Sequence, residues 1–351
     1  MTLILLLFFL FGNIFIGVFQ IKESIIKYFL IILLWVLIWG NYANADYISY
    51  LNLYNRIGIY GEGYITTEFL WVYLMKFSNI LNLNYTHFLF IISLISFYNI
   101  IKTVRKYSKN LNLFFVLYTI YPFFLNAVQI RFFFASSIAI LILKYSKDKY
   151  YIFKSFITLL IASFIHYSFF ILVPFLFLEK INKKYYNRLI LIISIVLFIS
   201  FINNSYLSIL SRFFDTQKII FYLENKPSFL GFIFMVLIHF LFFAIFFITY
   251  KKIKFKVDKN IIEIFYKLNI YSFLLIPFYY INGNFMRIFQ FFAIINYIFF
   301  IFSYNYIPKN QKIIYLFLFF LVPLIQFLHS VYLTNLDSVF KAILYNNFLF
   351  Y

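Results

Sequence analysis

Long apolar runs, separated by short polar clusters, follow one another along almost the whole chain. Many of them approach the roughly 20 residues that a helix needs to cross the hydrocarbon core of a bilayer. The runs are continuous rather than alternating, which argues against the strands of a transmembrane β-barrel. The pattern predicts an all-α fold, a polytopic integral membrane helix bundle with about 12 membrane segments, including short or re-entrant ones. We expect these segments near residues 2–20, 24–40, 86–101, 110–126, 130–143, 155–165, 167–178, 189–203, 229–250, 262–281, 287–304 and 313–333.

Composition agrees with a membrane protein and removes some kinds of chemistry. Hydrophobic residues make up 65% of the 351 positions, whereas a soluble globular chain is about half apolar. The chain has no cysteine, which removes thiolate catalysis and cysteine-based metal sites. Its 56 phenylalanines and 33 tyrosines share AT-rich codons with Ile, Asn and Lys, so base composition and lipid-facing packing explain them better than a stacking function. Residues 1–20 lack the basic start and cleavage site of a signal peptide, and we expect them to form the first membrane helix.

Basic residues gather in clusters between particular apolar runs and indicate which loops face the cytoplasm. By the positive-inside rule, these clusters mark cytoplasmic loops. They hold 21 of the 30 Lys and Arg residues, so the net charge of +19 requires no nucleic-acid partner. We therefore expect both termini outside and a single membrane domain, 1–351, with long outer loops at 41–85 and 203–228. The clusters are Lys22/Lys27, Lys102/Arg105/Lys106/Lys109, Lys144/Lys147/Lys149/Lys154, Lys180/Lys183/Lys184/Arg188, Lys251/Lys252/Lys254/Lys256/Lys259 and Lys309/Lys312.

Two apolar segments are too short or wrongly placed for ordinary spans. Residues 155–178 lie between two basic clusters and divide at His166 into two short stretches, which predicts a pair of short helices or a re-entrant hairpin. Residues 66–82 must stay on the outer side. We interpret them as a re-entrant or interfacial helix, with Glu68 and Lys76 on its polar side.

Arginine departs from the charge pattern that lysine follows. Four of the six arginines, namely Arg56, Arg131, Arg212 and Arg287, fall in loops predicted to lie outside. Arg131 and Arg287 each begin an apolar helix, where the helix N-terminus also favours anions. A guanidinium suits phosphate or carboxylate and stays charged when desolvated. Binding to lipid head groups is the simpler interpretation of Arg131, and a substrate phosphate is the functional one.

Further candidate residues lie on the side predicted to be outside. His166 is the only strongly polar group of its apolar pair and could serve as a general base or a hydrogen-bond donor. Asp46, Tyr50 and Tyr54 repeat every four residues, so they share one face of a helix that could bind a sugar. Glu68 follows in the same loop. An interfacial aromatic belt is the structural alternative for these tyrosines.

Several catalytic signatures are missing from the sequence. No D-x-D motif supports metal-dependent transfer from a sugar nucleotide, and no phosphate-binding glycine loop occurs. No His and carboxylate grouping has the spacing of a zinc site. Gly and Pro are few for a transporter built on broken helices.

At these residues the chain resembles the EpsG family of Wzy-type bacterial polysaccharide polymerases. The resemblance covers nearly the full length and rests on the order of several short motifs. Phe132 stands where the family commonly has glutamine. The matching residues are Asp46, Tyr50 and Tyr54 in an outer loop, Arg131 with Ala135, His166 with Ser168, and Arg287 at the start of a late helix.

The resemblance implies a membrane glycosyltransferase that makes exopolysaccharide, capsule or O-antigen. It would join oligosaccharide repeat units carried on undecaprenyl pyrophosphate, as donor and acceptor, at the outer face of the bacterial cytoplasmic membrane. Membrane lipids, a flippase and a chain-length regulator are the expected partners, and no cofactor or metal is expected. Arg131, His166 and Asp46 are then predicted to be catalytic, and Arg287, Tyr50, Tyr54 and Glu68 to bind substrate. A flippase for lipid-linked sugars and a membrane acyltransferase are the alternative functions.

Overall fold

The structure, a computed structural model, describes residues 2–19, 21, 25–60, 68–146, 148–203 and 226–350. In these ranges the chain is helical, and the only strand-like pairing is an isolated bridge between Asn41 and Asn347. The helices form two compact units. Unit 1 comprises Met1–Val173 and Tyr297–Tyr351, and unit 2 comprises Pro174–Asn296. Most of the predicted outer loop 203–228, including Arg212, lies outside the described residues.

Seven helices in the described ranges are long and apolar enough to cross a membrane. Four shorter apolar helices, of 10 to 17 residues, accompany them. The prediction of an all-α polytopic membrane bundle with short segments is confirmed. The seven long helices are Thr2–Phe19, Tyr85–Tyr107, Lys183–Ile202, Phe229–Ile253, Lys259–Ile281, Gly283–Tyr304 and Lys309–Leu333.

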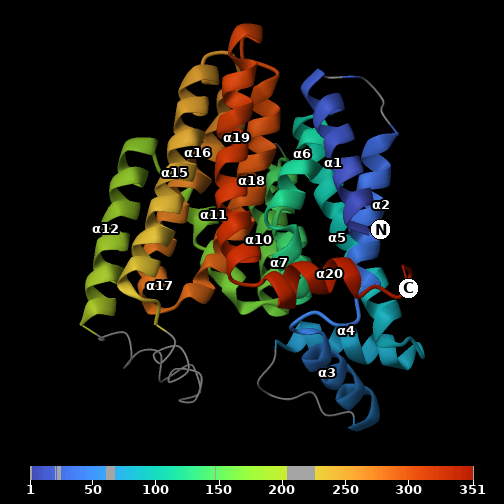
Figure 1. Ribbon diagram of the computed structural model, residues 1–351. Coiled ribbons are helices and arrows are strands. Elements are labelled where there is room, and N and C mark those ends of the chain that lie inside the picture. The colour runs from blue at the N-terminus through green and yellow to red at the C-terminus, as the bar shows by residue number, and fades with distance from the viewer. Residues whose placement is uncertain are drawn as a thin grey trace. The chain divides into compact units, whose positions relative to one another are not determined.

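Unit 1 carries most of the candidate residues. In Figure 1, α3 and α4 lie together at one end of α5. The helices that open the unit are α1 (Thr2–Phe19), α2 (Ile26–Trp39), α3 (Tyr47–Tyr60), α4 (Phe69–Ile80), α5 (Tyr85–Tyr107), α6 (Leu111–Ile120), α7 (Phe123–Val128), α8 (Ile130–Ala139), α9 (Leu141–Tyr145), α10 (Tyr151–Ile165) and the 3-10 turn η1 (Tyr167–Leu172). Those that close it are η4 (Lys309–Gln311), α19 (Lys312–Phe327), the π-helical η5 (Leu328–Leu333) and η6 (Leu336–Lys341), and α20 (Ala342–Tyr345).

Unit 2 is built from the following part of the chain, and its boundary with unit 1 falls within α18 (Met286–Tyr304). A buried histidine, His239, joins its helices through Nδ1 to the Tyr279 hydroxyl at 3.0 Å and Nε2 to Ser272 Oγ at 2.9 Å. The other elements are α11 (Phe175–Leu178), α12 (Lys183–Ile202), α15 (Phe229–Ile253), α16 (Lys259–Tyr271), η2 (Ser272–Leu274), α17 (Leu275–Ile281) and η3 (Gly283–Phe285).

Polar residues between the apolar runs cap several helices at their N-terminal ends. Asn84 accepts a hydrogen bond from the backbone of His87 at 2.9 Å at the start of α5. Asn110, Ser228 and Asp258 do the same for α6, α15 and α16. Such caps satisfy N–H groups that the first helical turn leaves unbonded. The clusters that predicted loops therefore also fix where the helices begin.

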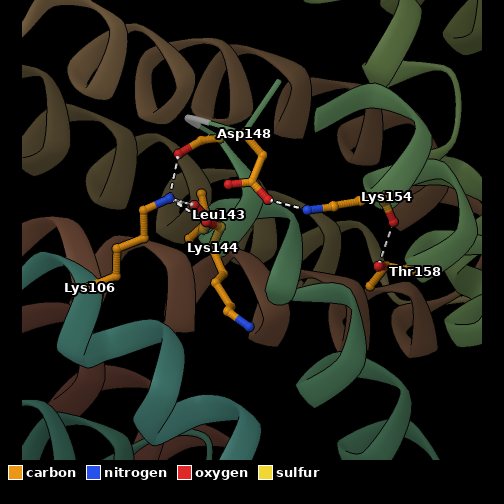
Figure 2. A network of polar contacts seen from close by, with 7 residues as sticks. Lys106, Leu143, Lys144, Asp148, Lys154 and Thr158 are labelled. Carbon is orange, nitrogen blue, oxygen red and sulfur yellow. Dashed lines mark hydrogen bonds and ion pairs between the residues drawn. The ribbon is translucent and has the colours of Figure 1, made fainter. Parts of the chain in front are cut away.

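The two ends of unit 1 bring together the loops that the charge pattern grouped. At the basic end, Arg105 donates to the Tyr28 hydroxyl at 3.1 Å. Lys106 donates to the carbonyl of Leu143 at 3.1 Å and to that of Lys144, as Figure 2 shows. These residues come from three clusters or segments predicted to be cytoplasmic, and the structure gathers them at one end.

At the other end of unit 1, the beginning of the chain meets its tail. The Thr2 hydroxyl donates to the carbonyl of Leu344 at 2.6 Å. Asn41, at the end of α2, donates to the carbonyl of Ala342 at 2.7 Å. The start, the first residues of the 41–85 loop and the tail, all predicted to be outside, therefore share one end of the unit.

The two segments that were predicted to be too short or wrongly placed for ordinary spans, 155–178 and 66–82, contain short helices. The helix α10 ends at Ile165, and the chain turns at His166, whose φ of −149° and ψ of 110° are not helical. At about 1.5 Å per residue, α10 reaches roughly 22 Å, less than the thickness of the hydrocarbon core. The helix α4 is shorter still. One expectation about it is wrong: Glu68, placed on the polar side of this segment, is only 7% exposed.

Candidate functional site at the start of α8

Arg131 is the second residue of α8 and forms an ion pair with an acid far away in the sequence. Its Nη1 donates to Glu68 Oε2 at 2.6 Å. The arginine side chain is 21% exposed and that of the glutamate is 9% exposed. Ionised, short and largely withdrawn from water, this contact belongs to the stronger class of hydrogen bonds. The charge that looked isolated in its own segment is therefore neutralised by Glu68.

Glu68 is held in place by the elements that surround it. It precedes α4 with extended backbone angles, and its side chain makes no cap bond to that helix. Its second oxygen, Oε1, accepts a hydrogen bond from the backbone N–H of Tyr167 at 3.3 Å. The helix α10 packs against both α4 and α8, which brings the three segments together. One carboxylate thus links the start of α8 to the turn that contains His166.

His166 caps the 3-10 turn that follows it. Its Nδ1 lies 2.7 Å from Ser168 Oγ and 3.4 Å from the backbone nitrogen of Ser168. A backbone N–H can only donate, so Nδ1 is the acceptor. We therefore assign the proton of the neutral ring to Nε2. This tautomer makes Nε2 a hydrogen-bond donor, one of the two roles predicted for His166.

Phe132 connects the arginine to the histidine by packing. Its buried ring packs against the His166 imidazole in a T-shaped arrangement, with the ring centres 5.4 Å apart. The same ring contacts Phe169 at 5.2 Å. The phenylalanine that departs from the family pattern therefore supports the turn at His166.

The tyrosines of α3 divide into two kinds. Tyr50 lies beside Arg131, with the guanidinium carbon 5.9 Å from the centre of its ring, within the range of a cation–π contact. Tyr54 is buried, and its hydroxyl donates to the Leu83 carbonyl at 2.7 Å and lies 2.8 Å from Ser78 Oγ. Burial raises the pKa of Tyr54 above its ordinary value of 10.0, so the hydroxyl stays protonated. The structure thus uses Tyr54 to hold α3 against its neighbours.

Asp46 stands at the start of α3, one turn before Tyr50. Its backbone carbonyl accepts from the N–H of Tyr50 at 3.1 Å, and its own N–H donates to Asn44 Oδ1 at 3.1 Å. The residue is partly exposed. Asp46 is therefore positioned on the same helix as the tyrosine that contacts Arg131.

A row of aromatic rings adjoins the ion pair. It begins with Tyr73 and Phe69 on α4, 6.2 Å apart, and Phe69 meets Phe164 of α10 at 4.6 Å. Phe170 continues it at 5.7 Å from Phe164, and Tyr167 lies 6.2 Å further on. All but Phe164 are more than 40% exposed. Phe69 follows Glu68 in the chain, and the backbone N–H of Tyr167 donates to Glu68. The row therefore borders the charged site.

Sequence reasoning named Arg131 but missed Gln129 and Trp71, which carry buried polar atoms in and around this site. Arg131 Nε, Gln129 Oε1 and Trp71 Nε1 are buried and have no hydrogen-bond partner among the described residues. Such atoms are rare in native proteins and call for an explanation. Trp71 lies 6.3 Å from the ring of Tyr50, and Gln129 directly precedes α8. Gln129 lies two positions before Arg131, and this closeness in the sequence could have pointed to it as a member of the site.

Arg287 belongs to unit 2, where it is the second residue of α18 and partly exposed. The structure thus brings together Arg131, Glu68 and Tyr50, places His166 beside them through Phe132 and Tyr167, and leaves Arg287 in the other unit. No group of three or more His, Asp or Glu side chains in the described ranges could hold a metal ion.

Fold and site together define a polytopic helical membrane protein with a charged site at one end of a helical unit. The sequence profile of the EpsG family matches residues 24–347, nearly the whole chain, and the protein belongs to that family. It is therefore a membrane protein of the polysaccharide polymerase type, and the family supports a glycosyltransferase-type enzyme. Comparisons with curated proteins and with solved structures give no significant match.

Proposed function

We propose that this protein joins lipid-linked oligosaccharide repeat units at the outer face of the bacterial cytoplasmic membrane. The donor is a glycan on undecaprenyl diphosphate, and the acceptor is the free sugar end of a second lipid-linked unit. The observation that carries the proposal is Arg131, held by buried Glu68 at the end of unit 1 that the charge pattern assigns to the outside. A cation fixed in this way suits a diphosphate.

The reaction forms one bond and breaks one. A hydroxyl oxygen of the acceptor sugar attacks the anomeric carbon of the donor and forms the glycosidic bond. The bond between that carbon and the diphosphate oxygen breaks, and undecaprenyl diphosphate leaves with the electron pair. The hydroxyl proton passes to a base and then to water. Negative charge grows on the leaving group, so fixed positive charge near it lowers the barrier.

Each predicted residue has a role in this step. Arg131 binds the diphosphate and stabilises the charge that develops on it. His166 donates from Nε2 to the substrate, in agreement with its tautomer. Asp46 is the remaining candidate for the base that accepts the hydroxyl proton, and Tyr50 contacts the sugars beside Arg131. Arg287 is a second candidate for phosphate binding.

The lipid part of the substrate also needs a surface beside the diphosphate. The aromatic row from Tyr73 to Tyr167 supplies one that is apolar, exposed and adjacent to Glu68. An isoprenoid chain lying along it would leave its diphosphate at Arg131. The row therefore supports a lipid-linked substrate over a water-soluble sugar nucleotide.

The proposal is tested in cells that lack the gene and carry variants of it. Without the protein, we expect single lipid-linked units to accumulate and long chains to disappear. Arg131→Lys keeps a charge for Glu68 but loses the bidentate fork, and we expect a loss of long chains of about 100-fold. Arg131→Ala should lose them entirely.

Protein levels of each variant must be measured, because Arg131→Ala leaves Glu68 as a buried, unpaired charge. Arg105→Lys is the matched control, since Arg105 lies at the basic end of unit 1. Normal chain length in both Arg131 variants, at a normal protein level, would contradict the proposal.

A further inference from the structure

Glu68 is the residue through which the two halves of the candidate site are connected. Its Oε2 accepts from Arg131 Nη1 at 2.6 Å, and its Oε1 accepts from the Tyr167 N–H at 3.3 Å. Each oxygen therefore binds a different element, α8 on one side and the turn after His166 on the other. The carboxylate therefore connects these two elements as well as balancing the charge of Arg131.

The geometry of the guanidinium shows how many N–H donors of Arg131 the ion pair with Glu68 uses. A guanidinium offers five N–H donors in a fixed plane. Nη1 is the donor used by Glu68, whereas Nε is buried and has no partner among the described residues. Glu68 thus engages one of these donors, and the arginine side chain stays 21% exposed.

The ion pair is expected to persist when substrate binds. Glu68 is 7% exposed, and a carboxylate that gave up Arg131 would become a buried charge with only a backbone N–H for a partner. Breaking a buried pair in this way is strongly unfavourable. The substrate diphosphate is therefore better bound in addition to Glu68 than in exchange for it.

We propose that Glu68 is a positioning residue: it fixes the Arg131 guanidinium in the orientation that meets the substrate diphosphate, and it sets the His166 turn at the same time. This inference rests on the proposed function and assigns Glu68 a role other than sugar binding. It acts through Arg131 and the Tyr167 backbone and does not contact the sugar. Its contribution lies in the transition state, where the alignment of both groups matters most.

The test uses the full-length protein in nanodiscs, with the lipid-linked units that accumulate in the deletion strain as substrate. Glu68→Gln keeps the size of the side chain but loses the charge and one of the two acceptor oxygens. We expect kcat to fall by about 10- to 100-fold, as for other residues that orient a functional group, with KM within about threefold of the wild type. Glu68→Asp keeps both oxygens on a shorter arm and should recover part of kcat.

A carboxylate that only balances charge, or that competes with phosphate, gives a different result. In that case Glu68→Gln would leave kcat unchanged, or lower KM at unchanged kcat, and either outcome overturns the inference. Thermal melting of each variant separates unfolding from a loss of kcat. If Glu68→Gln does not fold, a wild-type kcat in Glu68→Asp overturns the inference by itself. Asp337→Asn is the control, because Asp337 is an exposed partner of Lys341.

The two proposals fail in different ways. If the wild-type protein makes no polymer from these units, the proposed function fails. If the wild type makes polymer, Arg131→Lys does not, and Glu68→Gln retains the wild-type kcat, only the role of Glu68 fails.

Discussion

The helical run formed by α8 and α9 meets a cation at each end, and the two cations are bound differently. At the start, Arg131 gives one N–H group to Glu68, while its Nε has no partner among the described residues. At the end, Lys106 of α5 donates to the carbonyls of Leu143 and Lys144 and to Ser146 Oγ (Figure 2). Both cations lie within unit 1.

The difference separates a structural cation from one suited to a ligand. Lys106 donates to carbonyl groups of the last turn of a helix, and its positive charge complements the helix dipole there. All the acceptors just named for Lys106 are groups of the protein itself. Arg131 lies at a helix N-terminus, where the dipole repels a cation, and a buried acid holds it there. A cation at this position is unfavourable because of the helix dipole, so stability alone does not explain Arg131. Binding of an anionic ligand does explain it.

The largest effect outside the ion pair is expected at His166. His166→Ala removes the Nε2 donor and the cap of the 3-10 turn, and polymer formation should fall by about 100-fold. His166→Gln retains an amide donor and should lose less. Polymer formation per folded molecule is measured with the nanodisc assay.

His87→Ala is the matched control for the histidine, since its side chain is exposed at the start of α5. Unchanged polymer formation in His166→Ala would remove the histidine from the site. The contrast between the two ends of the helical run would then rest on Arg131 alone.

The sequence predicted the helical class, the break at His166 and the grouping of loops at the two ends of unit 1. These depend on apolar length, capping residues and charge, all of which are local properties. The ion pair between Arg131 and Glu68 joins residues 63 apart, and local reasoning could place both on one side without pairing them. The burial of Tyr54 could not be predicted for the same reason, because its partners Ser78 and Leu83 come from the next segment of the chain.

A smaller effect, on stability rather than activity, is expected at the other end of the run. Lys106→Met removes a donor to the carbonyls of Leu143 and Lys144 but keeps an apolar stem of similar length. Lys106 is exposed, so we expect a loss of about 1 kcal/mol in the free energy of unfolding. Thermal melting in detergent measures it.

Polymer formation per folded molecule should be unchanged in Lys106→Met. A large loss of activity at normal stability would mean that the basic end also contributes to the reaction. It would remove the distinction between a structural cation and a ligand-binding one.

The smallest effect is expected at Asp148, which pairs with Lys154 at 2.7 Å beside the Lys106 network (Figure 2). The hydrogen bond from Lys154 lowers the pKa of the Asp148 carboxyl below its ordinary value of 3.8. Its stabilising contribution is therefore complete above that value and is lost as the pH falls through the lowered pKa. Asp148→Asn should melt slightly below the wild type at pH 7, because exposed pairs contribute little. The difference should vanish once the wild-type carboxyl is protonated, and a difference that grows on acidification would show that the aspartate acts through some other contact.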